Sequence, residues 1–284
     1  MTQALYRVSV AGAPPRLARG TIEDGPRDLL REEVRLDDLL ARSGAALAET
    51  LVEAPGDGRC PTEARILAPI EDQEVWCAGV TYERSRDARM EESSEPTIYD
   101  RIYDAERPEL FFKAPGWRVR GPGESVGVRV DSGWDIAEPE LGLVLAADGS
   151  VAGYVIGNDM SSRTIEGDNP LYLPQAKVYD AACALGPAIV PAGAVSEPVF
   201  PVRMTIRREG AVLFEGDTST ARLRRSHEDL AGHLFRALTF PRGAILLTGT
   251  GVVPESSISL REGDVVRIEL GVLGVLENPV VAIG

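Results

Sequence analysis

The chain has 284 residues, of which 44% are hydrophobic and 26% are charged, and its formal net charge at pH 7 is -14. This length and composition are typical of a globular protein with one large domain, or one large domain and a small appendage. The acidic balance argues against nucleic acid as a partner, because neutralising phosphates requires basic patches.

Residues 1–70 predict a small α/β appendage at the start of the chain. Apolar and polar residues alternate over 6–10, which is typical of a strand, and apolar residues recur at helical spacing over 36–52. The Pro/Gly-rich stretch 55–58 ends that predicted helix. The segment therefore differs in character from the rest of the chain.

Residues 71–284 predict the catalytic domain of an α+β protein that is mainly β. A helix is predicted from Ser226 to Leu238, with Ser226 as its N-cap. Residues 84–109 are rich in Arg, Asp and Glu and lack periodicity, which predicts a long functional loop or lid. Short β-like runs separated by turn residues make up most of the remainder: 75–80, 126–130, 141–145, 151–156, 188–190, 202–206, 245–248 and 265–270.

Three acidic residues are the strongest functional signal. Glu138 and Glu140 lie on a strand-like run over 134–145, and a second such run ends at Asp159. Residues i and i+2 of a strand point to the same face, so paired strands would bring all three carboxylates together. Burying them together requires a cation, and oxygen ligands suit Mg²⁺, Mn²⁺ or Ca²⁺. The alternative is that the two glutamates lie on the solvated face of an edge strand.

Two further residues are candidates for acid–base chemistry. Glu109 stands where a charged segment enters an apolar run, and a carboxylate at such a place can have a raised pKa, although a strand-start glutamate often faces water. Lys177 follows a Pro-rich stretch, where it either covers the surface or stabilises negative charge in a site. Both residues therefore keep a functional and a surface interpretation.

The histidines weaken one class of mechanism. His227 and His233 both fall within the predicted helix, outside any site-like context. A hydrolase that uses a histidine as general base is therefore disfavoured, and a carboxylate base remains.

Two segments offer contacts to a ligand. Arg84, Arg86 and Arg89 form either a solvated basic face or a substrate-binding set, in which Arg86 is favoured. The glycine-rich stretch 248–251 lacks P-loop spacing, so its glycines more plausibly let the backbone approach a ligand, with Thr250 as a contact.

Cysteine usage and the apolar pattern predict the compartment. Cys60, Cys77 and Cys183 are widely spaced and odd in number, which favours free thiols in a reducing cytoplasm. The start of the chain lacks the pattern of a signal peptide, and no apolar run approaches the roughly 18 residues that cross a bilayer. We expect a cytoplasmic protein without a membrane partner.

The chain resembles the fumarylacetoacetate hydrolase superfamily over most of residues 74–284. The resemblance implies a mixed β-sandwich roll that acts on a 2-oxo acid as a homodimer or homotetramer. It also implies a divalent metal, Mg²⁺ above others, held by Glu138, Glu140 and Asp159. The motifs that carry the resemblance lie at 78–82, 138–141, 153–163, 177, 185–187, 247–251, 263–266 and 276–280.

Within this superfamily the chain more closely resembles the 2-keto-3-deoxy-D-arabinonate dehydratases, through residues 82–89, 108–113 and 169–177. The resemblance implies that Glu109 and Lys177 are catalytic. The further residues for which it and the motifs above imply substrate contacts are Ser85, Arg86, Lys113, Arg163 and Thr250.

One departure from the superfamily pattern separates two reactions. Hydrolytic members usually place a histidine where this chain has Ser85. The expected reaction is therefore dehydration of a 2-dehydro-3-deoxypentonate to 2,5-dioxopentanoate in pentose catabolism. The alternatives are an acylpyruvate or fumarylpyruvate hydrolase on the same metal site, and a non-catalytic metal-binding protein of the same fold.

Overall fold

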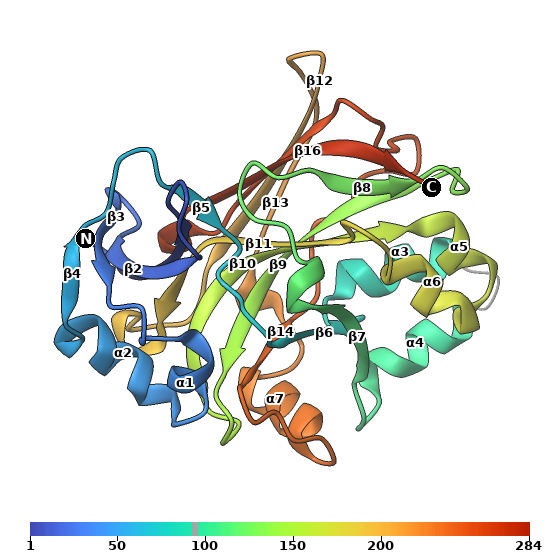
Figure 1. Ribbon diagram of the computed structural model, residues 1–284. Helices are drawn as coiled ribbons and strands as arrows, with labels where there is room; N and C mark the ends of the chain where they lie inside the picture. The colour runs from blue at the N-terminus through green and yellow to red at the C-terminus, as the bar shows by residue number, and fades with distance from the viewer. Residues whose placement is uncertain (93–95) are drawn as a thin grey trace.

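Two β-sheets stacked face to face form the body of the protein in the computed structural model, which describes residues 1–92 and 96–284 (Figure 1). The longer sheet runs in the order β4 (Gly56–Arg59), β3 (Gly25–Leu30), β2 (Arg16–Thr21), β1 (Gln3–Ser9), β11 (Cys183–Pro191), β10 (Val151–Ser162), β9 (Asp135–Leu145), β14 (Ala244–Leu247), β6 (Glu74–Gly79) and β7 (Glu109–Pro115), with β5 (Arg65–Leu67) beside β1. The smaller sheet runs in the order β13 (Ala211–Ser219), β12 (Pro201–Arg208), β15 (Val265–Glu269), β16 (Val275–Ile283) and β8 (Val126–Arg129).

The main core lies between the two sheets. Leu141 and Leu143 of β9 belong to the same buried cluster as Met204 and Ile206 of β12 and Ile268 of β15. All residues of β9 are buried, which explains why its apolar run is nearly continuous instead of strictly alternating. The sandwich confirms the predicted mainly β architecture.

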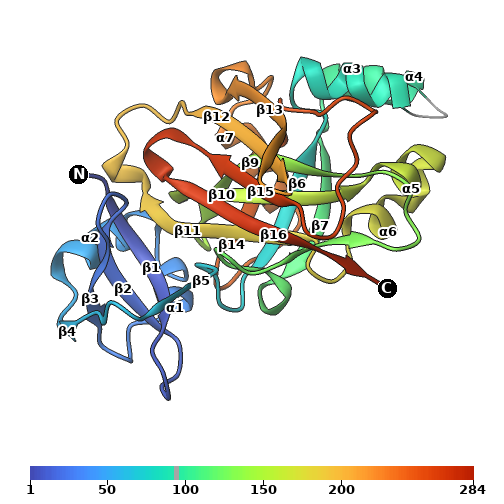
Figure 2. The same ribbon diagram turned by 90° about the horizontal axis from the view of Figure 1, so that it is seen from above.

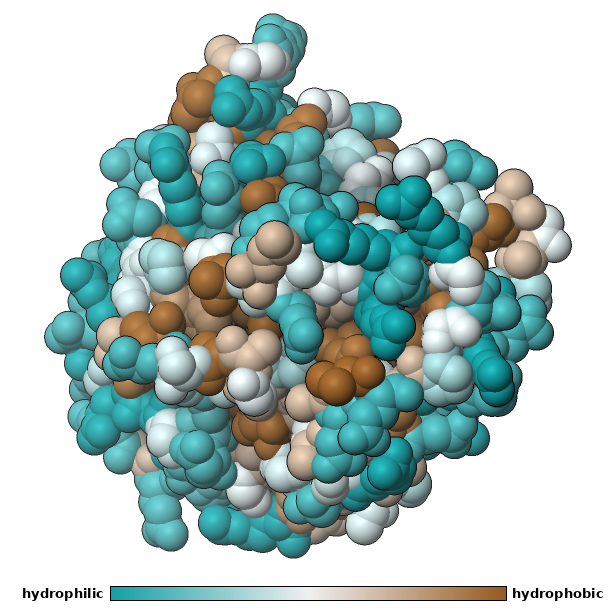
Figure 3. Space-filling model, turned by 90° about the vertical axis from the view of Figure 1, so that its left-hand side faces the viewer, coloured by the Kyte–Doolittle hydropathy of each residue, from teal (hydrophilic) through white to brown (hydrophobic). Residues whose placement is uncertain are grey.

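The amino-terminal segment continues the longer sheet. Leu5 of β1 pairs with Ile189 of β11, so β1 to β4 lie at one end of the molecule while α3 to α6 lie at the other (Figures 1 and 2). On the side of the molecule where the amino-terminal segment lies, hydrophilic residues predominate and hydrophobic ones form small separate areas (Figure 3). A domain boundary near residue 70 stays a prediction.

The helices cover the margins of the sandwich. They are α1 (Leu36–Leu40), α2 (Gly44–Glu53), α3 (Glu83–Glu92), α4 (Pro96–Asp104), α5 (Arg163–Asp168), α6 (Leu173–Lys177) and α7 (His227–Phe235). Single 3-10 turns lie at Gly116–Arg118, Pro170–Tyr172, Ala192–Ala194, Thr220–Arg222 and Gly271–Leu273. None of the described helices combines the length and the apolar character that crossing a bilayer requires.

Two helical predictions need correction and one is confirmed. The helix predicted over 36–52 is two helices, because the extended backbone of Ser43 ends the regular pattern between α1 and α2. The loop predicted over 84–109 is wrong for residues 84–92 and 96–104, which belong to α3 and α4. Residues 105–108 are irregular, as predicted, Glu109 begins β7, and residues 93–95 lie outside the described residues. The N-cap of α7 is confirmed, since the Ser226 hydroxyl accepts a hydrogen bond from the Asp229 amide at 3.1 Å.

The missed helix α3 has a physical explanation. Its sequence carries no apolar stripe, and the two residues that it buries are the small Ser85 and Ala88. Ala88 packs with Ile136 of β9 and with Val253, which holds the helix over the end of the longer sheet. Tertiary contact of a few small residues thus replaces the amphipathic pattern that sequence analysis detects.

Candidate active site

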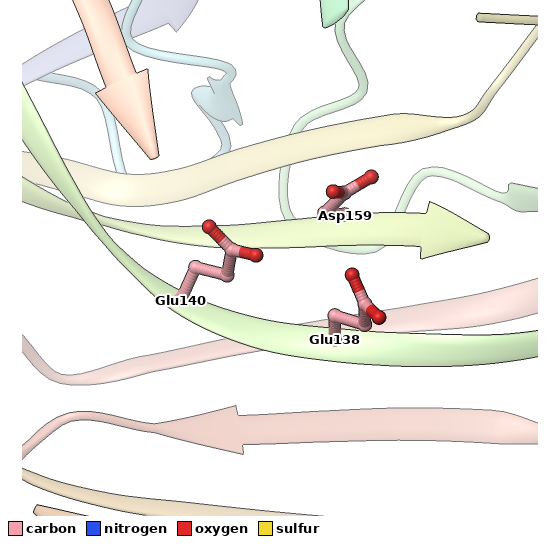
Figure 4. Close-up of side chains that lie close together, drawn as sticks. All are labelled: Glu138, Glu140 and Asp159. Carbon is pink, nitrogen blue, oxygen red and sulfur yellow. The ribbon is translucent and has the colours of Figure 1, made fainter. Parts of the chain in front are cut away.

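Strands β9 and β10 bring three carboxylates together. In their antiparallel register Asp159 lies opposite Glu138, and Glu140 lies two residues along the same face. One oxygen from each residue lies within 4.8 Å of the others, and all three side chains are buried and point toward one another (Figure 4). We refer to Glu138, Glu140 and Asp159 as the carboxylate triad.

Cations surround the first member of the triad. The Lys177 ammonium donates to Glu138 Oε2 at 2.6 Å, and the Arg163 guanidinium donates to Glu138 Oε1 at 2.7 Å. Arg89 donates to the same Oε1 at 3.3 Å. Burial alone would raise the pKa of Glu138, but Lys177, Arg163 and Arg89 outweigh it and hold this pKa well below its usual range. Glu138 is therefore ionised.

Glu140 is in the opposite electrostatic situation. Its Oε2 accepts one hydrogen bond, from the Gly249 amide at 2.7 Å. Burial, followed by repulsion from Asp159 and Glu138, raises the pKa of Glu140 well above that of an ordinary glutamate. Gly249 has φ of +92°, and a Cβ there would stand 2.0 Å from Thr81 Oγ1, so only glycine suits this donor.

These features fit a hard divalent cation. The triad offers three oxygen donors within reach of one point, and oxygen-only ligation is what Mg²⁺ and related ions prefer. Burial first, and then repulsion from Asp159 and Glu138, raise the pKa of Glu140, and Lys177 and the Gly249 amide do not offset this rise. A divalent ion would offset that repulsion and favour the ionised form of Glu140.

Glu109 and Lys177 line the same cavity as the triad. Glu109 is the first residue of β7, and its carboxylate occupies the space beside Gly79, where a Cβ would stand 2.1 Å from Glu109 Oε2. Burial raises the pKa of Glu109, while Arg89 and Lys177 limit the rise. Such a group takes up and releases a proton at a higher pH than an ordinary glutamate.

Lys177 ends α6 and is buried. Its ammonium donates to Ser161 Oγ at 2.5 Å and to Asp159 Oδ2 at 3.1 Å, in addition to Glu138. Burial favours the neutral amine, but Asp159 and Glu138 outweigh it and raise the pKa of Lys177. The side chain is therefore a fixed positive charge at the triad.

A small cavity lies over the triad. Among the residues predicted from the sequence, it brings together the triad, Glu109, Lys177, Ser85 and Thr250. The hydroxyls of the last two are engaged with the backbone, since Ser85 Oγ donates to the Tyr82 carbonyl at 2.8 Å and Thr250 Oγ1 to that of Val252 at 3.2 Å. The full lining is Ala78, Gly79, Val80, Ser85, Arg89, Glu109, Phe111, Glu138, Glu140, Asp159, Glu166, Lys177, Gly249 and Thr250.

Three other predicted contacts do not line this cavity. Arg86 turns to Asp87, to which it donates at 2.8 Å, and its guanidinium lies 4.9 Å from the centre of the Tyr103 ring. Arg163 is buried behind Glu138. Lys113 is fully buried, pairs with Asp159 and donates to the Met160 carbonyl at 2.8 Å. Direct contact of these residues with substrate stays a prediction.

The two lysines share an unusual placement. Lys113 and Lys177 are the only lysines in the chain, and both are buried beside Asp159. Every other basic side chain apart from the histidines is an arginine. Both lysine ammonium groups of this chain are thus located at the triad.

Of two further lining residues, Arg89 was a candidate that the sequence did not favour, and Glu166 was not identified from the sequence. Arg89 was one of three arginines in a charged segment, and α3 turns its side chain into the cavity. Glu166 lies on the short helix α5, which the Ser162 hydroxyl caps by accepting from the Ile165 amide. Arg89 and Glu166 form a buried ion pair. Because the two residues lie far apart in the chain, this pair leaves no local signal in the sequence. The described lining includes neither of the two histidines.

Comparisons with known proteins agree with this geometry. The model of the family described as fumarylacetoacetate (FAA) hydrolase C-terminal matches residues 74–281. The chain is 49% identical over 216 residues to a protein of Haloferax volcanii named probable 2-keto-3-deoxyxylonate dehydratase, which covers 76% of this chain and 74% of the relative. It is 43% identical over 223 residues to the 2-dehydro-3-deoxy-D-arabinonate dehydratase of Saccharolobus solfataricus, covering 77% and 75% respectively.

Solved structures extend the likeness to the whole chain. A 2-keto-3-deoxy-D-arabinonate dehydratase complexed with magnesium and 2,5-dioxopentanoate superposes with a TM-score of 0.83 at 36% identity. The match covers 99% of this chain and 99% of that one, so it includes the amino-terminal segment as well as the sandwich.

Proposed function

This chain belongs to the fumarylacetoacetate hydrolase family, and we propose that it is a metal-dependent dehydratase that converts a 2-dehydro-3-deoxypentonate to 2,5-dioxopentanoate. The observation that carries the proposal is the buried carboxylate triad, which shares one cavity with Glu109 and Lys177. The names of the relatives and of the solved structure supply the substrate class.

The triad would hold the metal, with Mg²⁺ proposed above Mn²⁺ or Ca²⁺. A divalent ion bound there would supply Lewis acidity, which makes the protons beside a keto group easier to remove and stabilises negative charge on its oxygen. The chain's own residues divide the remaining work. Arg163 orients Glu138 through Oε1, and the Gly249 amide orients Glu140.

Glu109 is the proposed base. It would remove a proton from C3, and the fixed positive charge of Lys177 would stabilise the negative charge that develops on the C2 oxygen. The protonated Glu109 would then return its proton to the C4 hydroxyl, which leaves as water and gives a C3–C4 double bond. Loss of a proton from C5 and return of one to C3 gives the C4–C5 enol, which becomes the C5 aldehyde. Positioned proton transfer of this kind contributes about 10²- to 10⁴-fold in rate.

The composition of the cavity favours dehydration over the alternative reaction. An acylpyruvate or fumarylpyruvate hydrolase needs an activated water, and Ser85 stands where hydrolytic members of the superfamily usually place a histidine. The hydroxyl of Ser85 is hydrogen-bonded to the Tyr82 carbonyl, so it offers no base. The alternative is not favoured.

The test is direct. The purified protein is incubated with 2-keto-3-deoxy-D-arabinonate and Mg²⁺, and the formation of 2,5-dioxopentanoate is followed by proton NMR, with an EDTA control. We expect turnover that requires the metal. Cleavage of an acylpyruvate without any loss of the sugar acid would replace this proposal with the hydrolase.

Two further properties belong to the proposal. We propose a homodimer or homotetramer, supported by the family resemblance and testable by light scattering coupled to size-exclusion chromatography. We also propose a reducing cytoplasm as its compartment, supported by the free, buried state of Cys60, Cys77 and Cys183.

A further inference from the structure

One polar pair in the cavity has no part in the reaction described above. Arg89 of α3 and Glu166 of α5 form an ion pair between Nη1 and Oε2, and both residues line the cavity. Their side chains are 11% and 4% exposed. Because burying two charged groups carries a large desolvation cost, a pair of this kind inside a ligand cavity calls for a functional explanation.

The pair retains capacity for hydrogen bonding. Glu166 Oε2 is in ionic contact with Arg89 Nη1 and lies 3.9 Å from Arg163 Nη1, but it receives no hydrogen bond of acceptable geometry from any residue that the structure describes. The second guanidinium nitrogen of Arg89 reaches Glu138 Oε1 only at 3.3 Å, where Arg163 already donates at 2.7 Å. Arg89 therefore has donors, and Glu166 an acceptor, that a ligand in the cavity could use.

The other lining groups are already assigned. The triad is proposed to hold the metal, and Glu109 and Lys177 to carry the acid–base chemistry. The hydroxyls of Ser85 and Thr250 are bonded to backbone carbonyls. Arg89 and Glu166 are thus the charged lining residues that remain for the part of the substrate beyond C3.

We propose that Arg89 and Glu166 recognise the hydroxylated C4–C5 end of the sugar acid and so set specificity for it over 2-oxo acids without hydroxyls. Arg89 donates to a hydroxyl oxygen, and Glu166 accepts from a hydroxyl proton. The inference rests on the proposed dehydratase function and deepens it. The inference requires that the C1 carboxylate and the C2 oxygen of the substrate lie at the triad. The remaining carbon atoms of the substrate are then directed toward the wall of the cavity.

The chemistry predicts strong selection. A site that is built to bond a hydroxyl rejects an analogue that lacks it, because buried polar groups of the site are then left unpaired. Contacts to C4 and C5 exist before and during proton removal from C3, so losing them is expected to act mainly on KM.

The experiment compares two reactions of the same enzyme with Mg²⁺. The first is dehydration of 2-keto-3-deoxy-D-arabinonate. The second is exchange of the C3 protons of 2-oxopentanoate in D₂O. This reaction needs the same proton removal, and 2-oxopentanoate has as many carbon atoms as the sugar acid but lacks its hydroxyls. The variants are Arg89→Met and Glu166→Gln, and Arg84→Met is the matched control, because Arg84 is an exposed arginine on the same helix.

We expect kcat/KM for dehydration to fall by roughly 10- to 100-fold in Arg89→Met and Glu166→Gln, chiefly through KM. The exchange rate of 2-oxopentanoate at saturation should change by less than about threefold in Glu166→Gln, and Arg84→Met should change neither reaction. Arg89→Met also loses the contact to Glu138, so it should slow both reactions, and dehydration more than exchange. Equal losses in the two reactions would overturn the inference, because the pair would then act through Glu138 and the metal site. Unchanged dehydration in both variants would overturn it as well.

Failure of the proposed function has a different signature. It would be seen in the unsubstituted enzyme, as absence of dehydration under conditions in which 2-oxopentanoate still exchanges its C3 protons. Glu166→Gln is the cleaner of the two variants, since the described ion pairs of Glu166 are to Arg89 and Arg163 and not to the triad, and its replacement keeps the shape of the side chain. The shift in melting temperature on adding Mg²⁺ should be the same in this variant as in the parent.

Discussion

The ammonium of Lys177 lies 2.6 Å from Oε2 of Glu138, and this contact joins a proposed catalytic cation to the strand that carries two members of the triad. Lys177 therefore has two functions that substitution can separate. It neutralises buried carboxylates, which affects stability, and it stands where it can stabilise a developing negative charge, which affects rate.

Replacing Lys177 by methionine should lower both stability and activity. Removing one partner of a buried ion pair costs about 3–5 kcal/mol, because the remaining charge is left uncompensated. Loss of a preorganised donor costs roughly 10²- to 10³-fold in kcat. Thermal unfolding in EDTA and in excess Mg²⁺ checks the effect on stability. The melting temperature of the variant should lie closer to that of the parent with Mg²⁺ than with EDTA. An equal difference under both conditions would show that Lys177 does not share the triad with the metal.

Glutamine substitutions at Glu138 and Glu140 should change stability in opposite directions when EDTA is present. Glu138→Gln removes the charge that Lys177, Arg163 and Arg89 surround, so it should destabilise the fold. Glu140 has a raised pKa in the folded state, so its ionisation opposes folding as the pH rises above the usual glutamate range. Glu140→Gln removes this cost and should raise the melting temperature at pH 8.

The same pair of variants serves as a test of metal binding. Both should lose most of the melting-temperature increase that Mg²⁺ produces in the parent protein, because each lacks one oxygen donor of full charge. A parent-like Mg²⁺ shift in either variant would exclude that residue as a ligand.

Replacing Glu109 by glutamine should abolish the acid limb of the pH–rate profile. As a base Glu109 must be ionised, and burial raises its pKa, so kcat/KM should fall with decreasing pH at a higher pH than an ordinary glutamate would produce. Glu109→Gln should reduce kcat by about 10²- to 10⁴-fold and leave Mg²⁺ binding intact. A variant that kept the parent's acid limb would show that another group is the base.

A methyl group at Gly79 should displace the carboxylate of Glu109. A Cβ at that position would stand 2.1 Å from Glu109 Oε2, which forces the side chain away from the cavity. We expect Gly79→Ala to lower kcat by on the order of 10- to 100-fold, because small misplacements of a reacting group are costly. The control is Gly232→Ala on α7, where an added Cβ meets nothing within 4 Å; equal effects of the two variants would contradict the explanation.

The convergence of the carboxylate triad was predictable from the sequence, because it follows from the local geometry of two strands. Glu138 and Glu140 share a strand face by the two-residue period, and the apolar runs around them and Asp159 predict neighbouring strands. The structure shows the expected convergence. By contrast, β4 was missed because all its residues are exposed and its sequence, Gly56–Arg59, has no β-like character.

Which arginine of α3 lines the cavity was not predictable from the sequence, because this depends on tertiary packing. Arg89 lines the cavity, and the residue before it, Ala88, packs against Ile136 of β9. Arg86, on the same helix and favoured from the sequence, turns to Asp87 and Tyr103 instead. Which arginine of a polar helix faces inward depends on the face that packs against the sheet, and a charged segment without an apolar period does not reveal that face.

With its only two lysines enclosed, this protein carries almost no primary amines for reagents to reach. Succinimidyl esters, reductive methylation and amine-coupled surfaces should therefore modify Lys113 and Lys177 only as fast as the interior becomes accessible. The rate of this slow labelling, measured by mass spectrometry, would report transient openings of the molecule without any engineered probe.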